Sequence, residues 1–338
     1  MAQFNGGAGA GNATPPDLNS DDHAPKPPPK GWKRYLWPAI GGLAIVISFW
    51  LLAKELRGLS WSDLWAGIEG IRGHSWLLIC LSTLGCYVTL GLYDAMALAH
   101  LRKKLSFVFV SLCALTTYAL AHTIGASAFT GAVIRYRAYT AKGLSGAEVG
   151  VLVTFCTLTF VLGVMVMLGL VFLFAPDLEL RLHEHLPEGL LIWAALVLWA
   201  LVALYVLASF LRLPPLKIRG FSLFYPRPDV TLRQVLVAPT ELLFASAIFY
   251  FALPELGNPG YLTVMAVFVI AFSLALLSHA PGGLGVFELA MITGLPEFPP
   301  ETVLAALIVF RIFYFLIPLA IGLVLVAGFE RERLRETP

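Results

Sequence analysis

The chain has 338 residues, of which 58% are hydrophobic and 13% are charged. Soluble globular proteins have about 45–50% apolar and about 25% charged residues, so the composition excludes a soluble fold. The net charge of +2 is small and indicates no class of partner by itself, and we expect no nucleic-acid partner. The composition predicts a polytopic membrane protein.

The first residues of the chain differ in character from the rest. Residues 1–30 are rich in Gly, Pro and Asp, and they cannot bury enough apolar surface to fold. The apolar stretch that follows comes too late and is too long for a signal peptide. We therefore expect a disordered tail over 1–33, a single helical membrane domain over 34–328 and a short tail over 329–338.

Apolar segments fill the predicted membrane domain, and about 20 apolar residues suffice to span a bilayer. The chain is predicted to be all-α, with about eight spans. We expect them at Tyr35–Ala53, Ser75–Leu98, Phe107–Phe129, Val149–Ala175, Gly189–Leu211, Pro239–Leu253, Tyr261–Ala280 and Val303–Gly328. Between the first two spans, Glu55–Arg72 alternates apolar and charged residues, as in an amphipathic helix on the membrane surface.

The charges of the loops test this topology, because cytoplasmic loops are rich in Lys and Arg. A basic first tail is cytoplasmic, but if Phe107–Phe129 simply crossed, every later basic loop would lie outside. If the chain instead enters the membrane and breaks in two re-entrant or broken helices, near 116–142 and 281–296, the later basic loops lie in the cytoplasm as expected. Both termini are then cytoplasmic, which for a bacterial protein places the chain in the inner membrane.

Both predicted breaks coincide with sequence rich in glycine. The first reads AHTIGASAFTGAVIRYRAY (Ala121–Tyr139) and the second reads SHAPGGLGVFELAM (Ser278–Met291). Each has a His followed three residues later by Gly, which indicates either an internal repeat or chance. Broken helices within a membrane mark binding sites in transporters. The residues expected to break the helices are Gly125, Gly131, Pro281, Gly282, Gly283 and Gly285.

Glu288 carries a charge inside the second break. A carboxylate at membrane depth costs about 2.5–3.5 kcal/mol on insertion scales, so it needs a partner. Arg311, in the middle of the last span, is the first candidate and Arg135 is the second. The pair is either a structural ion pair or part of a site for substrate or ions, and both roles are compatible.

Other polar residues within the apolar segments have simpler interpretations. Asp94 is interpreted as a contact between helices, and Glu241, near the start of a predicted span, as interfacial. His122 and His279 have side chains that can carry protons near neutral pH, but a hydrogen-bonded core histidine is the favoured description of each.

The basic sequence after the first break has two readings. Arg135 and Arg137, with Tyr136 and Tyr139 beside them, form either a site for a lipid phosphate at the cytoplasmic surface or ordinary loop charge. The cysteines lie in apolar segments without the spacing of metal ligands, so we expect small hydrophobic residues and no metal or cofactor.

The stretch Pro281–Glu288, PGGLGVFE, resembles the lysylphosphatidylglycerol synthase transmembrane family, which includes the membrane half of the bacterial multiple peptide resistance factor. The earlier pattern Gly125…Gly131…Arg135…Tyr139…Gly143 and Arg311 are also similar to it, and the resemblance runs from about Tyr35 to Gly328. It implies a helical membrane domain with re-entrant pieces that moves aminoacylated phospholipids between leaflets.

The resemblance also implies that lysyl transfer resides elsewhere. In full-length relatives a separate soluble domain attaches the amino acid, whereas only FERERLRETP follows Gly328 here. We therefore expect no enzymatic activity from this chain, a phospholipid substrate such as lysylphosphatidylglycerol, and a separate lipid aminoacyltransferase as a partner. An oligomer is compatible with the sequence.

Three functions compete at this point. A flippase-type lipid transporter would lack direct ATP coupling, because no G-x-x-x-x-G-K-[ST] phosphate loop is present. An intramembrane serine protease would use Ser127 with His279 as base, but the glycine expected after that serine is absent. The third alternative is a non-transporting membrane partner of a lipid-modifying enzyme.

Overall fold

The structure is a computed structural model. It describes residues 61–124, 127–175, 187, 189–213, 216–218, 221–223, 225–278 and 283–336. All of these belong to one unit, Ile40–Pro338. The predicted tail 1–33 and the predicted span Tyr35–Ala53 lie outside the described residues.

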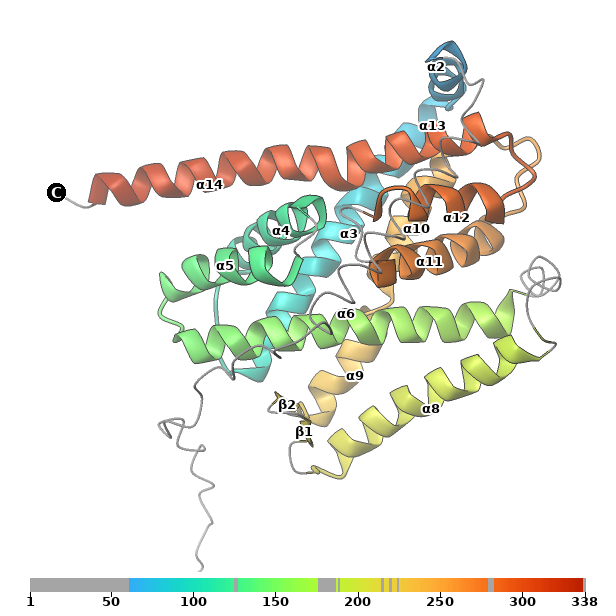
Figure 1. The fold of residues 1–338 in the computed structure, drawn as a ribbon. Coiled ribbons are helices and arrows are strands. Elements are labelled where there is room, and N and C mark those ends of the chain that lie inside the picture. Colours follow the sequence, from blue (N-terminus) through green and yellow to red (C-terminus); the bar gives the residue numbers. More distant parts are fainter. Residues whose placement is uncertain are drawn as a thin grey trace, which may run out of the picture. The chain divides into compact units, whose positions relative to one another are not determined.

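Helices make up nearly all of the described chain, which confirms the all-α prediction (Figure 1). Six helical segments in the described residues are long and apolar enough to cross a membrane. They are α3 (Gly73–His100), α6 (Gly146–Phe174), α8 (Leu190–Phe210), α9 (Pro228–Val237) joined to α10 (Thr240–Ala252), α11 (Tyr261–Ser278), and α13 (Pro300–Arg311) followed by the π-helix η2 (Ile312–Leu316) and α14 (Ile317–Glu336).

Some predicted boundaries differ from the structure. The span expected at Pro239–Leu253 begins earlier, at Pro228, because α9 and α10 join with only Ala238 and Pro239 between them. Helix α14 continues to Glu336 and so includes most of the predicted tail 329–338. Between α8 and α9, strands β1 (Leu216–Ile218) and β2 (Phe221–Leu223) form a small antiparallel hairpin.

Large apolar side chains are exposed on the outside of the helices. On α8, Trp193 is 69% exposed and Leu204 is 61% exposed, and α3 exposes Leu77 and Leu84 in the same way. Water would disfavour so much contiguous apolar surface, whereas lipid tails are its natural solvent. The exposed faces of these helices therefore fit a bilayer.

The predicted span Phe107–Phe129 is two helices instead of one. Helix α4 (Phe107–Ile124) ends before residues 125–126, which are outside the described residues, and α5 (Ser127–Thr140) follows. The two helices pack antiparallel, since the Phe109 and Tyr139 rings meet edge to face at 5.9 Å. Near the turn, a Cβ on Gly131 would lie 3.1 Å from Thr117 Cγ2. We call this pair the first hairpin.

A second hairpin is formed by α11 and α12 (Val286–Gly294) on either side of residues 279–282, which are not described. A Cβ on Gly283 would lie 2.8 Å from Ala275 Cβ, and one on Gly294 would lie 2.4 Å from Val267 Cγ1. These contacts are those of antiparallel helices. With 9 residues, α12 is about 14 Å long, much less than the thickness of a bilayer core.

Contacts between helix ends define two opposite ends of the bundle. At one end, Arg72 before α3 pairs with Glu255 after α10, and we call this the Glu255 end. At the other, Lys103 after α3 pairs with Glu148 of α6 at 2.9 Å, and we call this the Lys103 end. The first hairpin begins and ends beside Lys103, whereas the loops that flank the second approach each other at Gly257 and Glu297. The two hairpins therefore enter the bundle from opposite ends.

The two halves of the described chain repeat one order of elements in opposite directions. The first half has α3, the first hairpin and α6, and the second has α9–α10, the second hairpin and α13–α14 (Figure 1). The halves meet where α3 packs on α10, and Tyr93 Oη donates to the Ala238 carbonyl at 2.5 Å. Such inverted halves are common in transporters, and this order favours an internal repeat over chance.

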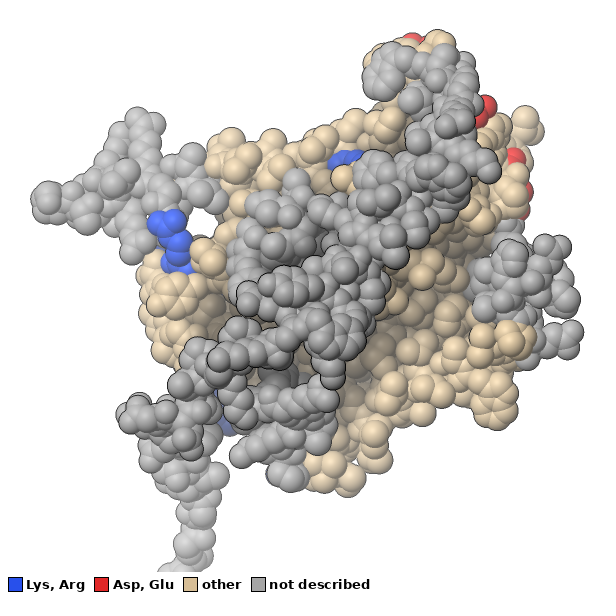
Figure 2. Space-filling view, in the orientation of Figure 1, with Lys and Arg blue, Asp and Glu red and all other residues tan. Residues whose placement is uncertain are grey.

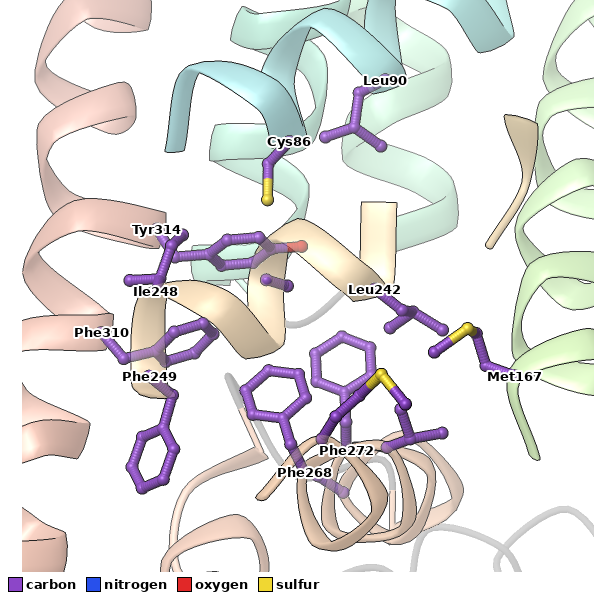
Figure 3. Packing of buried hydrophobic residues seen from close by; sticks show 14 of the residues in the cluster. Cys86, Leu90, Met167, Leu242, Ile248, Phe249, Phe268, Phe272, Phe310 and Tyr314 are labelled. Carbon is purple, nitrogen blue, oxygen red and sulfur yellow. The ribbon is translucent and has the colours of Figure 1, made fainter. Parts of the chain in front are cut away.

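The apolar core lies around α10. Figure 3 shows Leu242, Ile248 and Phe249 of α10 among side chains of α3, α6, α11 and α13. The Phe268 ring contacts the Phe287 and Phe310 rings edge to face, so this core includes α12 of the second hairpin. These contacts hold α12, which carries Glu288, and α13, which carries Arg311, against α11.

Candidate functional site

A buried polar cluster surrounds Asp94, in the half of α3 nearer the Lys103 end. Arg135 of α5 donates from Nη2 to Oδ1 at 2.6 Å and from Nε to Oδ2 at 3.1 Å. Tyr139 Oη donates to Oδ2 at 2.8 Å, and Cys156 Sγ of α6 to Oδ1 at 3.2 Å. Asp94 is 0% and Arg135 5% exposed. These four residues, the Asp94 cluster, connect α3, α5 and α6.

The helical spacing of α5 explains which residues join this cluster. Arg135 and Tyr139 are four residues apart and lie on the same face, toward α3. Arg137 and Tyr136 lie elsewhere on the helix and are exposed. The expected grouping of Arg135 with Arg137 at one surface phosphate site is therefore wrong, because Arg135 and Tyr139 are turned into the bundle.

Arg135 has a further contact inside the bundle. Its Cζ lies 4.8 Å from the centroid of the Tyr118 ring of α4, in cation–π geometry. The guanidinium is thus enclosed by a carboxylate and an aromatic face. This arrangement makes the Asp94 cluster a sealed contact that fixes the first hairpin against α3.

The second polar cluster consists of Glu288 of α12 and Arg311 of α13, which we call the Glu288 pair. Arg311 Nε donates to Glu288 Oε1 at 3.0 Å, and Nη2 contacts the same oxygen. The Gly285 N–H donates to Oε2 at 2.7 Å, so the carboxylate also caps α12. Of the two expected candidates, Arg311 is the partner of Glu288.

The two clusters differ in their access to the outside. Side chains of the Glu288 pair are 9% exposed for Glu288 and 22% for Arg311, whereas those of the first pair are 0% for Asp94 and 6% for Arg135. Both clusters attach the second helix of a hairpin to a long helix. Of these two clusters, the Glu288 pair is the one that combines opposite charges with partial access, as a zwitterionic ligand requires.

The backbone before α12 depends on glycine. Gly283 has φ +69° and Gly285 has φ +82°, in a region that side chains with a Cβ rarely adopt. Gly285 also supplies the N–H that binds Glu288. The predicted break residues Gly283 and Gly285 are thus the positions at which the chain turns into the short helix.

Replacing Gly285 with Ala is expected to lower the free energy of unfolding by about 1–2 kcal/mol, since the new residue must hold a positive φ. The control is Gly73→Ala at the start of α3, where a Cβ would meet nothing within 4 Å. Thermal unfolding of the purified protein in detergent measures the difference. Equal melting temperatures for the two variants would contradict this role of Gly285.

Several predicted site residues fall where the structure describes nothing of them. Gly125, His279, Pro281 and Gly282 lie outside the described residues. His122 and Ser127 lie in α4 and α5, but their side chains are not described. Their predicted roles stay predictions. Among the described residues, no group of three or more His, Cys, Asp or Glu side chains could hold a metal ion.

Sequence reasoning missed one buried acid. Glu241 was expected at an interface, but α9 continues into α10 and places it near the middle of the joined span. It is 0% exposed, and Tyr314 Oη donates to its Oε1 at 2.5 Å. The signal that could have located it is the apolar sequence VLVAP before Thr240, which extends the span toward Pro228.

The fold and the two charge clusters define a polytopic helical membrane protein with discontinuous helices and buried ion pairs. A family model described as the lysylphosphatidylglycerol synthase TM region matches residues 39–322. The chain belongs to this family, as the PGGLGVFE stretch suggested.

Known relatives include both short and long proteins. The chain is 28% identical to the uncharacterized protein slr0712 of Synechocystis over 86% of its own length and 91% of that protein. It is 26% identical to the inner membrane protein YbhN of Escherichia coli, over 83% of this chain and 87% of that one. It is also 26% identical to the phosphatidylglycerol lysyltransferase of Staphylococcus aureus, over 82% of this chain but 32% of the relative.

Proposed function

We propose that this protein is a flippase-type transporter that moves an aminoacylated phospholipid, such as lysylphosphatidylglycerol, between the leaflets of a bacterial inner membrane. The observation that carries the proposal is the Glu288 pair, an ion pair with partial access at the start of a short broken helix. Membership of a family named for lysylphosphatidylglycerol supports the choice of lipid.

The chemistry of the pair matches the charges of such a headgroup. An aminoacyl phosphatidylglycerol has an anionic phosphate and at least one ammonium group. Arg311 can donate to phosphate oxygens and Glu288 can accept from an ammonium, so the headgroup can replace each residue's present partner with one of the same charge. Separating a buried pair without replacement leaves unpaired charges at a cost of several kcal/mol. A zwitterionic or cationic headgroup supplies that replacement.

The exposed charges support one orientation in the membrane. Exposed basic residues predominate at the Lys103 end, and exposed acidic residues at the Glu255 end include Glu69 and Glu297. Figure 2 shows the visible Asp and Glu atoms toward α2 (Trp61–Glu69) and the start of α13, whereas most of the visible Lys and Arg atoms lie toward the opposite end and one patch lies between. By the positive-inside rule we place the Lys103 end on the cytoplasmic side.

We propose that another enzyme attaches the amino acid; the match to the lysyltransferase relative covers 32% of that protein. We propose no catalytic role for the chain itself, and a separate lipid aminoacyltransferase as its partner. An oligomer is compatible with the exposed apolar faces. Transport would run downhill or use an ion gradient.

Exchange of labelled lysylphosphatidylglycerol between the leaflets of reconstituted liposomes tests the proposal. The full chain is expected to speed exchange well above that of empty vesicles, and Glu288→Gln is expected to slow it at least tenfold, because the neutral amide cannot pair with an ammonium or with Arg311. The control is Glu301→Gln in the first turn of α13, which should exchange at the original rate.

Exchange no faster than in empty vesicles, and unaffected by Glu288→Gln, would contradict transport. That result would favour a non-transporting partner of a lipid-modifying enzyme. If the original protein exchanges lipid and Glu288→Gln exchanges it at the same rate, Glu288 is not part of the lipid-binding site.

A further inference from the structure

The carboxyl group of Glu241 lies at the centre of the described helices. Its side chain is 0% exposed, and Oε1 accepts the Tyr314 hydroxyl at 2.5 Å. In the described part of the chain Oε2 has no hydrogen-bond partner, and no Lys or Arg forms an ion pair with Glu241. It differs in this from Asp94 and Glu288, which each have an arginine.

The lack of a cationic partner matters because Glu241 lies deep within a predicted membrane span. Glu241 lies near the midpoint of the span Pro228–Ala252, and Tyr314 lies near the midpoint of Pro300–Leu325. An ionised carboxylate that is removed from water and has no cation beside it is strongly disfavoured. The neutral acid, with its proton on Oε2, leaves a single neutral donor unsatisfied, which costs far less. We therefore infer that Glu241 is protonated in this conformation.

The groups around Glu241 are neutral as well. Helix α10 packs against α3, α6, α9, α11, α13 and η2. Two titratable groups contact Glu241: the Cys86 Sγ donates to its carbonyl at 3.6 Å, and the Tyr314 hydroxyl donates to Oε1. Other titratable groups on these helices are Tyr87, Tyr93 and Tyr261. The charged group closest along the chain to Tyr314 is Arg311, which is bound to Glu288, and Arg135 is bound to Asp94.

Tyr314 connects Glu241 to the Glu288 pair. It lies in the π-helix η2, and its carbonyl accepts the Tyr87 hydroxyl at 2.9 Å. Figure 3 shows its ring extending beside α10, close to Cys86 of α3. Single π-helical turns are rare, and they are frequent at functional sites. Arg311 precedes Tyr314 by about one turn of the same helix, so a change at the Tyr314–Glu241 contact reaches Arg311 through continuous backbone.

We propose that Glu241 is a proton-binding site that couples lipid movement to a proton gradient, which rests on the proposed transport function. The acid holds its proton in the closed conformation described above. When a conformational change admits water to Oε2, the proton passes to water and leaves a carboxylate. The carboxylate accepts a stronger hydrogen bond from the Tyr314 hydroxyl. The resulting shift of η2 moves Arg311 and changes its ion pair with Glu288. No group is oxidised or reduced.

Infrared spectroscopy of the full chain in liposomes tests the protonated state directly. At neutral pH the original protein is expected to have a C=O stretching band of a protonated carboxylic acid, and Glu241→Gln is expected to lack it. The control Glu301→Gln, which alters an acid in the first turn of α13, should retain the band. A band that persists in Glu241→Gln, or that is missing from the original protein, would overturn the assignment of the proton to Glu241.

Lipid exchange in the same liposomes tests the coupling. A gradient of one pH unit can bias transport about tenfold for each coupled proton. For the original protein, the ratio of the lipid exchange rates in the two directions is expected to change several-fold when the gradient is imposed. Glu241→Gln, which is isosteric with the protonated acid, should still exchange lipid but at a rate independent of the gradient.

The outcomes separate this inference from the proposed function. Exchange by the original protein that ignores the gradient would overturn the coupling and leave lipid transport intact. Absence of exchange in every sample would overturn the transport function and the coupling with it. If Glu241→Gln fails to fold, Tyr314→Phe replaces it, because it removes the hydroxyl that binds Oε1. Tyr314→Phe is expected to shift the midpoint of the pH dependence of the infrared band, and an unchanged midpoint would contradict the proposal.

Discussion

Replacing Asp94 with Asn is expected to lower the free energy of unfolding by about 3–5 kcal/mol, because Arg135 would stay charged and buried without its partner. Arginine cannot release its proton in a protein, so the charge cannot be avoided. Asn keeps one acceptor oxygen in place of the two of Asp94, which accept from the Tyr139 hydroxyl and the Cys156 thiol, so one of these two donors would also lose its acceptor. Thermal or denaturant unfolding in detergent micelles measures the loss.

The chain offers a matched control for this variant. Asp229 pairs with Arg227 at 3.7 Å, and both side chains are 56% exposed. Asp229→Asn should change stability by less than about 1 kcal/mol, because exposed ion pairs contribute little. The double variant Asp94→Asn, Arg135→Met removes both charges and should be more stable than Asp94→Asn alone. Equal effects of Asp94→Asn and Asp229→Asn would contradict the buried pairing.

Replacing Gly163 with Ala is expected to destabilise the protein by about 3 kcal/mol, at the upper end of the usual cost of overpacking. A Cβ at this position of α6 would lie 2.4 Å from the carbonyl oxygen of Ala238, which is backbone and cannot rotate away. The same oxygen accepts the Tyr93 hydroxyl, so moving it would also disturb α3.

Gly150→Ala in the same helix is the control, since a Cβ there would meet nothing within 4 Å. It should raise stability by up to about 1 kcal/mol, because Ala favours a helix more than Gly does. Melting temperatures of the two variants, measured side by side, are therefore expected to move in opposite directions. A shift of both in the same direction would indicate that α6 and the α9–α10 junction are not in close contact.

Much of the fold was accessible from sequence. Apolar length located α3, α6, α8 and α11 within a few residues, because a bilayer requires about 20 apolar residues from each span. The conflict between loop charges and simple crossing located the break between α4 and α5. The positive-inside rule constrains the whole series of spans, so one misplaced crossing alters every later loop.

The candidate site was only partly accessible. Glu288 and Arg311 could be paired because each is an isolated charge in an apolar segment and needs an opposite charge. The partner of Arg135 could not be found in that way, because Asp94 lies 41 residues away on another helix and Arg135 was grouped with its neighbours in sequence. The helical spacing of Arg135 and Tyr139 indicates a shared face, and that pattern was available.

Sequence reasoning missed the burial of Glu241 for a different reason. The predicted span begins at Pro239, and proline usually interrupts a helix interior. In the structure, α9 ends at Val237 and α10 begins at Thr240, and the two continue as one span. Whether a proline begins a span or lies inside one depends on packing against neighbouring helices, here α3 at Tyr93 and α6 at Gly163.

The thiols of the molecule differ in accessibility in a way that has a practical use. Cys86, Cys113 and Cys156 are buried, whereas Cys80 is exposed on the outer surface of α3. A membrane-permeant thiol reagent should therefore attach at one position of the native chain without any cysteine being removed. A spin label or fluorophore at that position would face the acyl chains, and it would report how the lipid surroundings of this helix change while the protein works.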